Sequence, residues 1–268
     1  MLTPAEADAA IAAHRVQFPE ELLTLPACAG RVLRQDIHAE RDAPPFDRVA
    51  MDGIAIAIAA FRDGRRKFRV AAMQAAGQAP VPLESPTDCI EVMTGASLPS
   101  GCDTVVPVER LSVAAGVATI DAAYAPEPWM HVHRRAADAR AGDRLLASGT
   151  RLGGPELAIA ASAGQSTLKV TRLPRIAVIS TGDELVEPGM TILDHQVRRS
   201  NSYGLAASLR LAGFPPATDL HLPDQRPLLV QRLAAEIGRH DVLVLSGGVS
   251  AGRHDYVPAV LAEIGVRR

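Results

Sequence analysis

The chain has 268 residues, of which 47% are apolar and 22% charged, and its net charge is −2. This charge balance gives no bulk electrostatic reason to expect nucleic acid or a membrane surface as a partner. Cys28, Cys89 and Cys102 form no CxxC pair, which argues against a disulfide framework and favours a reducing compartment. Because the sequence has no secretory leader pattern and no apolar stretch of about 18 residues, we expect a cytoplasmic protein.

The N-terminal half predicts one helix and then a small β domain. Thr3, Pro4 and Glu6 have the pattern of a capping box, which predicts a helix that runs to about His14 or Phe18. The polar, proline-bearing segment 39–53 has neither helical nor strand period. Short β-like runs separated by Gly and Pro then predict a small barrel or sandwich. These runs are 54–58, 68–72, 89–93, 104–108 and 117–120.

The C-terminal half predicts a parallel sheet. After a short helix at 155–163, apolar runs at 175–180, 217–222 and 241–245 alternate with helices. The helices are expected at 201–212, from Pro227 with Leu229, Leu233 and Ile237 on one face, and at 255–264. The first and third runs have the continuous apolar character of strands buried on both faces. This βαβαβα order is typical of a parallel sheet with crossover helices, whose ligands bind at the carboxyl ends of the strands.

Three loops at that expected edge carry polar residues. They contain Ser180-Thr181-Gly182-Asp183-Glu184, then Asp224, then Ser246-Gly247-Gly248-Val249-Ser250 with Asp255 at the next helix start. Glycines and hydroxyls beside a helix start are suited to cradle a phosphate. Each loop alone is also explained by turn geometry and helix capping. The shared edge is what favours a binding site.

Six segments also resemble one known family. STGDEL, SNSYGL and SGGVSAGRHDY resemble the domain that binds molybdopterin, and PPFDRVAMDG, VMTGASLPSGCDTVVPVE and RRAADARAGDRLLASGTRL resemble the molybdopterin molybdenumtransferases. The resemblance implies an α/β fold in which 174–268 form a three-layer αβα molybdopterin-binding domain. An elongated N-terminal region would comprise 1–53 and 137–173, with a small β-barrel domain inserted at 54–136.

The resemblance implies transfer of molybdate to adenylylated molybdopterin with release of AMP. The implied catalytic residues are Asp52, Thr94, Glu184, Asp224 and Asp255, of which Glu184, Asp224 and Asp255 would bind Mg²⁺. The implied molybdopterin-binding residues are Ser180, Thr181, Gly182, Asp183, Ser200, Asn201, Ser246, Gly247, Gly248, Ser250 and Asp138. The resemblance also implies an elongated homodimer, in which Asp52 and Thr94 approach the ligand from the second subunit. The molybdopterin adenylyltransferase is a further expected partner.

The sequence departs from the family pattern at several places. Arg48 and Val49 replace small polar residues, Ile54 replaces an aromatic residue, and Ala136 and Ala137 replace a glycine and an acidic residue before Asp138. The sequence printed here stops before a Pro-Gly-Lys-Pro-type loop and a C-terminal β domain. We therefore expect a shortened chain or a truncated paralogue.

The sequence is also compatible with other functions. A non-catalytic carrier or sensor of molybdopterin is the alternative to catalysis, whereas residues 40–150 argue against an adenylyltransferase. Arg198 and Arg199, next to Ser200, are candidates to meet an anion. His131 and His133 are expected to be surface histidines without a metal role.

Overall fold

A computed structural model describes residues 3–248 and 256–267. The chain divides into two compact units, and each is described by itself. The α/β unit comprises Met1–Arg34, Arg151–Gly153 and Thr167–Arg268. The β unit comprises Gln35–Thr150 and Gly154–Ser166.

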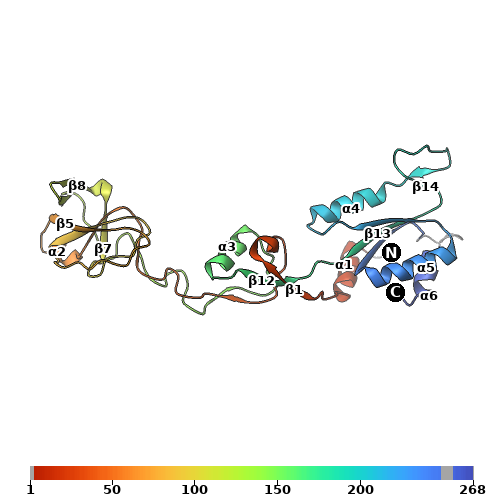
Figure 1. Cartoon of the computed structure of the whole chain (residues 1–268), viewed down its shortest axis with the longest axis horizontal. Coiled ribbons are helices and arrows are strands. Elements are labelled where there is room, and N and C mark those ends of the chain that lie inside the picture. The colour runs from red at the N-terminus through yellow and green to blue at the C-terminus, as the bar shows by residue number, and fades with distance from the viewer. Residues whose placement is uncertain (1–2, 249–255, 268) are drawn as a thin grey trace. The chain divides into compact units, whose positions relative to one another are not determined.

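The α/β unit is built on a parallel sheet in the order β16-β13-β17. Its strands are β13 (Ile176–Thr181), β16 (Thr218–Leu222) and β17 (Val242–Ser246). Figure 1 shows α4 (Asn201–Leu211) on one face of the sheet, with α5 (Arg226–Arg239) and α6 (Val257–Glu263) on the other. The predicted parallel sheet with crossover helices is therefore confirmed.

The core of this unit lies between the sheet and α5 and α6. Ile179 of β13 packs with Leu229 and Leu233 of α5 and with Val260 of α6, and all four are fully buried. Every residue of β13 is buried, because the strand has a neighbour on each side and helices on both faces.

Two expectations about this core are wrong. Ile237 is 40% exposed, and Glu236 takes the buried position on α5 instead. With 3.6 residues per turn, the stripe that passes through Leu229 and Leu233 continues at i+3 as well as at i+4. Strand β17 is half-buried throughout, not buried on both faces, because it lies at an edge of the sheet among the residues described.

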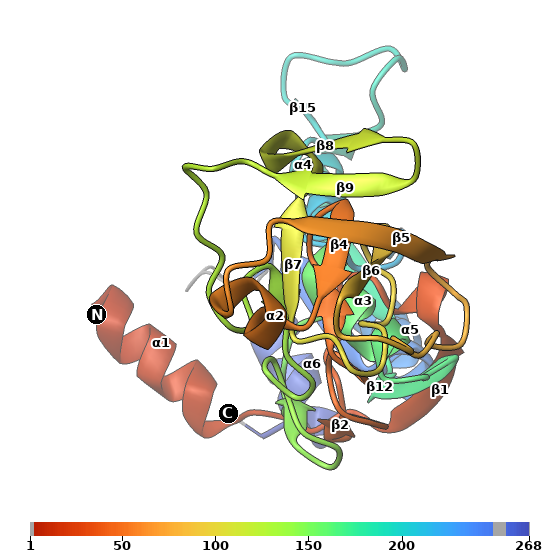
Figure 2. The ribbon, with the colours of Figure 1, turned by 90° about the vertical axis from the view of Figure 1, so that its left-hand side faces the viewer.

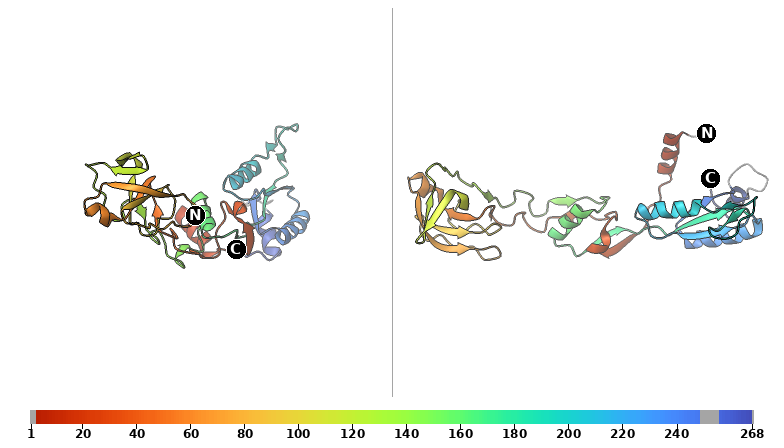
Figure 3. Two further views of the ribbon diagram at one scale, coloured as in Figure 1. Left: turned by 60° about the vertical axis from the view of Figure 1, so that its left-hand side comes forward. Right: turned by 90° about the horizontal axis from the view of Figure 1, so that it is seen from above.

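The remaining elements of the α/β unit are an exposed helix and short strand pairs. Helix α1 (Pro4–Ala13) has the predicted capping box and ends with His14 as its C-cap, at the nearer of the two expected ends. It buries none of its residues and stands away from the sheet of its unit (Figure 3). The paired strands are β1 (Glu20–Thr24) with β12 (Thr167–Thr171), and β14 (Leu185–Val186) with β15 (Val197–Arg198); η1 (Leu25–Cys28) follows β1.

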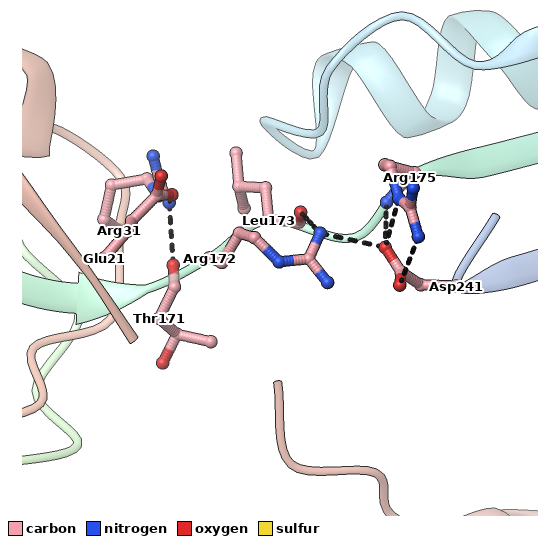
Figure 4. A network of polar contacts seen from close by, with 7 residues as sticks. All are labelled: Glu21, Arg31, Thr171, Arg172, Leu173, Arg175 and Asp241. Carbon is pink, nitrogen blue, oxygen red and sulfur yellow. Dashed lines mark hydrogen bonds and ion pairs between the residues drawn. The ribbon is translucent and has the colours of Figure 1, made fainter. Parts of the chain in front are cut away.

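A network of ion pairs fixes the stretch between β12 and β13 (Figure 4). Arg172 Nη1 donates to Asp241 Oδ2 over 2.9 Å, and the backbone N–H of Arg175 donates to the same oxygen over 2.8 Å. The hydrogen bonds from the Arg172 side chain, and then those from Arg175, hold the pKa of the Asp241 carboxyl well below its usual range. Arg31 continues the network by pairing with Glu21 and donating to the Thr171 carbonyl.

The β unit contains a curled six-stranded sheet in the order β7-β4-β6-β5-β9-β8 (Figure 2). Its strands are β4 (Gly53–Ile56), β5 (Lys67–Gln74), β6 (Asp88–Val92), β7 (Thr104–Pro107), β8 (Leu111–Ala114) and β9 (Val117–Ile120). All five predicted strands are present. Strand β8, which has four residues and is mostly exposed, was not predicted.

Both faces of this sheet are covered by apolar residues. Ile54 and Ile56 of β4 belong to one cluster with Phe68, whereas Ala55 between them belongs to a second cluster with Val92. This division follows from the period of two along a strand. The packing on both faces fixes the position of β4, the strand that follows the turn at Asp52.

Shorter elements complete the β unit. They are β2 (Ile37–His38), β3 (Arg48–Val49), α2 (Ile58–Arg62), η2 (Val108–Arg110), β10 (Val132–His133), β11 (Arg144–Leu146) and α3 (Gly154–Ser162). Strand β10 pairs with β3, and β11 with β2. The expectation of no strand within 39–53 is therefore wrong at Arg48 and Val49 and at Gly53, where β4 begins.

Candidate functional site

A cavity of about 350 Å³ lies at the carboxyl ends of β13 and β17 in the α/β unit. The predicted site residues that line it are Ser180, Thr181, Glu184, Ser200, Asn201, Ser246 and Gly247. Gly182, Asp183, Asp224 and Gly248 lie in the loops that adjoin these lining residues. The expected edge of the parallel sheet is thus where these polar residues converge.

Two hydroxyl groups at the end of β13 have no hydrogen-bond partner within the described part of the chain. Ser180 and Thr181 are each only 2% exposed, and their side-chain oxygens are fully buried. Leaving a buried hydroxyl unpaired costs about 1–3 kcal/mol, so such groups are uncommon without a reason. Because both residues line the cavity, they are suited to bind a polar ligand there.

Two glycines bring the backbone of the third loop close to Thr181. Gly247 has φ +103°, and a Cβ at this position would collide with the Thr181 carbonyl oxygen. Gly248 has φ +60°, and its Cβ would lie 2.8 Å from Thr181 Oγ1 and 2.7 Å from a methyl group of Val257. The glycine pair is therefore required by close approach of the backbone as well as by φ.

The start of α4 forms another wall of the cavity. Asn201 Nδ2 donates to Ser246 Oγ over 2.9 Å, which ties the helix start to the third loop. The Ser200 side chain makes no capping hydrogen bond to the helix. Backbone N–H groups at such a helix start favour an anion.

The two arginines before Ser200 line the cavity but already have protein partners. Arg199 is 6% exposed and pairs with Asp219 at 2.6 Å and with Glu187 at 2.8 Å. Arg198 Nη1 donates to the carbonyl oxygens of Glu187 and Met190. Sequence reasoning missed Asp219, because it lies at an exposed position of β16 and pairs with an arginine 20 residues away.

The acidic residues of the first two loops have distinct positions. Glu184 lines the cavity, and its carboxylate would collide with a Cβ at Gly182, whose φ is +142°. Asp183 Oδ1 accepts a hydrogen bond from the backbone N–H of Asp224 over 3.1 Å, so it joins the two loops.

The Mg²⁺ set stays a prediction. Asp255 and Ser250 lie outside the described residues. Among residues 3–248 and 256–267, no three His, Cys, Asp or Glu side chains gather as a metal site.

Asp52 and Thr94 contact each other in the β unit. Thr94 donates to Asp52 Oδ1 from its hydroxyl and from its backbone N–H, each over 2.6 Å. These bonds, that of the hydroxyl first, lower the pKa of the Asp52 carboxyl. Asp52 also lines a cavity of about 530 Å³ whose other walls include Val108 and Leu111. Thr94 thus holds the ionised Asp52 carboxylate in one orientation.

Asp138, also in the β unit, is bonded to a histidine. His133 Nε2 lies 2.9 Å from Asp138 Oδ1, and Arg48 Nη2 lies 3.0 Å from His133 Nδ1. His131 is 3.2 Å from the Tyr124 hydroxyl. Both histidines are partly exposed, and each lies within hydrogen-bond distance of another side chain. Ala136, in place of the family's glycine, still adopts φ +62°.

The cysteines are buried and unpaired, as predicted for Cys89 and Cys102. Burial raises the pKa of each of these two thiols to about 12. Neither thiol is therefore a nucleophile at neutral pH.

Comparison with known proteins decides the family. Residues 2–164 match the MoeA N-terminal region (domain I and II), and residues 177–268 match the probable molybdopterin binding domain. The whole chain is 41% identical to a molybdopterin molybdenumtransferase of Synechocystis sp., of which it covers 69%. The chain belongs to the molybdopterin molybdenumtransferase family. The resemblance seen in its motifs is thereby confirmed.

More distant relatives agree. A molybdopterin molybdenumtransferase of Nostoc sp. is 34% identical over 94% of this chain and 58% of its own length. A molybdopterin biosynthesis MoeA protein from Pyrococcus horikosii has a TM-score of 0.77 at 27% identity, and the match covers 99% of this chain and 68% of that one. The chain thus spans between 58% and 69% of the length of these relatives. Within residues 3–248 and 256–267, no helix is long and apolar enough to cross a membrane.

Proposed function

We propose that this chain transfers molybdate to adenylylated molybdopterin and releases AMP. The observation that carries the proposal is the pair of buried, unpartnered hydroxyls of Ser180 and Thr181 on the cavity at the sheet edge. Family membership supplies the substrate class, because the relatives are named for this reaction.

In this proposal the cavity binds the phosphate groups of the substrate. The hydroxyls of Ser180 and Thr181 donate to phosphate oxygens, and the glycines at 247 and 248 allow their backbone to approach. The start of α4, with Asn201, favours the negative charge. Because the bond to be broken is a phosphoric anhydride, orientation and charge neutralisation contribute more than a covalent nucleophile.

We also propose that Mg²⁺ takes part. Carboxylate oxygens and substrate phosphates are its preferred ligands, and one or two carboxylates are enough when phosphates complete the set. Glu184 on the cavity fits this requirement, and Asp224 and Asp255 would supply further oxygens. When bound, the ion would neutralise phosphate charge.

The active form would be a homodimer in which Asp52 and Thr94 serve the cavity of the partner subunit. The molybdopterin adenylyltransferase would supply the substrate, and both would act in the cytoplasm. Complementation tests the dimer: an Asp52→Asn chain mixed with a Glu184→Gln chain should regain part of the activity that each lacks. Two inactive variants that form dimers and stay inactive when mixed would contradict sharing of the site.

The activity is tested by incubating the chain with adenylylated molybdopterin, Mg²⁺ and molybdate. We expect AMP release that depends on molybdate and falls strongly in Glu184→Gln. Tight binding without AMP release would indicate a carrier or sensor of molybdopterin instead. If the wild-type chain neither binds the substrate nor releases AMP, the proposed function is wrong.

A further inference from the structure

Arg48, His133 and Asp138 form a continuous line of polar contacts in the β unit. Arg48 Nη2 is 3.0 Å from His133 Nδ1, and His133 Nε2 is 2.9 Å from Asp138 Oδ1. The residues lie 85 and 5 positions from one another along the sequence, so the fold brings them together. The His133 and Asp138 side chains are 34% and 57% exposed. A polar contact this exposed contributes little to stability, so stability does not explain the arrangement.

The arginine determines which nitrogen of His133 carries the proton. A guanidinium can only donate hydrogen bonds, so Nδ1 of His133 must accept from Arg48. The ring is then neutral with its proton on Nε2, where it donates to Asp138 Oδ1. Arg48 therefore fixes the direction of both hydrogen bonds.

The backbone holds both ends of this line. Strands β3 and β10 pair with Arg48 opposite His133, and the neighbouring Val49 is buried in the core. The backbone N–H of Asp138 donates to the Ala43 carbonyl over 2.9 Å. The side chains thus start from fixed positions, which reduces the entropy lost when they order.

Asp138 differs from the other carboxylates on these segments. Asp42 accepts from the Arg135 side chain and the Ala141 backbone, and Asp47 accepts from the Arg134 side chain and the Arg135 backbone. Those two carboxylates thus hold residues 134, 135 and 141 in place. Asp138 is held through Oδ1, whereas its Oδ2 has no hydrogen bond to any residue that the structure describes.

We propose that Arg48 and His133 are positioning residues, which hold Asp138 so that Oδ2 accepts an N–H or O–H group of the substrate. The inference rests on the proposed function, because it takes adenylylated molybdopterin as the ligand of Asp138. It assigns a role to Arg48 and to His133, neither of which the sequence motifs marked as functional.

The test combines nitrogen NMR of the full chain with binding of adenylylated molybdopterin. Long-range proton–nitrogen correlation should show His133 as the Nε2–H tautomer, and Arg48→Met should give a mixture of tautomers. His133→Ala should weaken binding about tenfold, whereas His133→Gln, which still offers an N–H group, should stay within about threefold of wild type. His131→Ala is the matched control and should leave Kd unchanged.

A double-mutant cycle separates positioning from a general structural role. In an Asp138→Asn background, His133→Ala should weaken binding no further, because its effect passes through the carboxylate. The Nδ1–H tautomer in wild type, equal binding by His133→Ala and wild type, or full additivity with Asp138→Asn would each overturn the inference.

The failure modes are distinguishable. Should His133→Ala not fold, Arg48→Met carries the binding test, with an expected loss of about threefold. A wild-type chain that does not bind the ligand overturns the proposed function and this inference with it. A wild-type chain that binds, with variants that bind equally well, overturns this inference alone.

Discussion

Replacing Thr181 with valine tests whether its hydroxyl is kept for a ligand. Thr181 is 2% exposed, and its Oγ1 has no partner among the residues described. Burial of an unpaired hydroxyl costs about 1–3 kcal/mol, and valine has nearly the same shape without that cost. We therefore expect Thr181→Val to raise the free energy of unfolding by about 1 kcal/mol, measured by urea denaturation without ligand.

The same substitution should weaken substrate binding. A hydrogen bond to a charged group such as phosphate contributes about 1.5–3 kcal/mol, which corresponds to a roughly ten- to hundredfold increase in Kd for adenylylated molybdopterin. Higher stability with weaker binding is the combined result that a ligand-directed hydroxyl predicts. Isothermal titration with Thr181→Val and wild type at one salt concentration measures it.

Thr104 offers a matched control in the same chain. It is equally buried, at 0% exposure, but its Oγ1 donates to the Glu127 carbonyl over 3.2 Å. Thr104→Val should lower the free energy of unfolding by about 1 kcal/mol and leave substrate binding unchanged. If Thr181→Val loses as much stability as Thr104→Val and keeps its affinity, the reasoning about the unpartnered hydroxyl is refuted.

Three further predictions concern stability and reactivity. Ala136→Gly should raise the free energy of unfolding by up to about 1 kcal/mol. A left-handed φ costs a non-glycine residue about 1–2 kcal/mol, and the greater chain entropy of glycine in the unfolded state cancels part of that gain. Ala137→Gly should lower the free energy of unfolding, and the reverse order of the two variants in urea denaturation would contradict the prediction. The low pKa of Asp241 means that its ion pairs stabilise the fold at pH values above the unfolded-state pKa of about 3.9, and that this stabilisation is lost as pH falls through the folded pKa. Asp241→Asn should therefore be less stable than wild type at pH 7. Its stability should also depend less on pH below about pH 4. Cys89 and Cys102 should resist alkylation at pH 8 until urea unfolds the chain, and fast labelling of the folded chain would show that they are not buried thiols.

Local patterns predicted the elements that hold the cavity. The apolar run before Ser180 predicted a buried central strand, and β13 is buried at every residue. Thr3 and Glu6 predicted the capping box of α1, because that motif involves neighbours three residues apart. Gly247 was expected in a loop at the carboxyl edge of the sheet, and it lies there, with the Thr181 carbonyl where its Cβ would be. In each case the interaction is local or follows directly from strand order.

Partners across the chain could not be predicted in this way. Arg199 was a candidate for an anionic ligand, yet Glu187 and Asp219 pair with it. His133 was expected to be an ordinary surface histidine, although Asp138 is only five residues away and Arg48 lies opposite on the next strand. A loop conformation decides the first contact and strand register the second, and periodicity in one sequence determines neither.

The hydroxyls of Ser180 and Thr181 show most clearly where sequence reasoning stops. Their position could be predicted from the sequence, because two hydroxyl residues that end an apolar strand must lie near the carboxyl edge of a parallel sheet. Their lack of hydrogen-bond partners could not be predicted, because each of the three converging loops contains groups that are able to pair with them. The structure leaves both hydroxyls buried and unpaired, and the Thr181 carbonyl lies where a Cβ at Gly247 would be. A stable fold with no ligand to bind would gain from filling this place with apolar side chains, so the cost of the unpaired hydroxyls is itself an argument for a ligand.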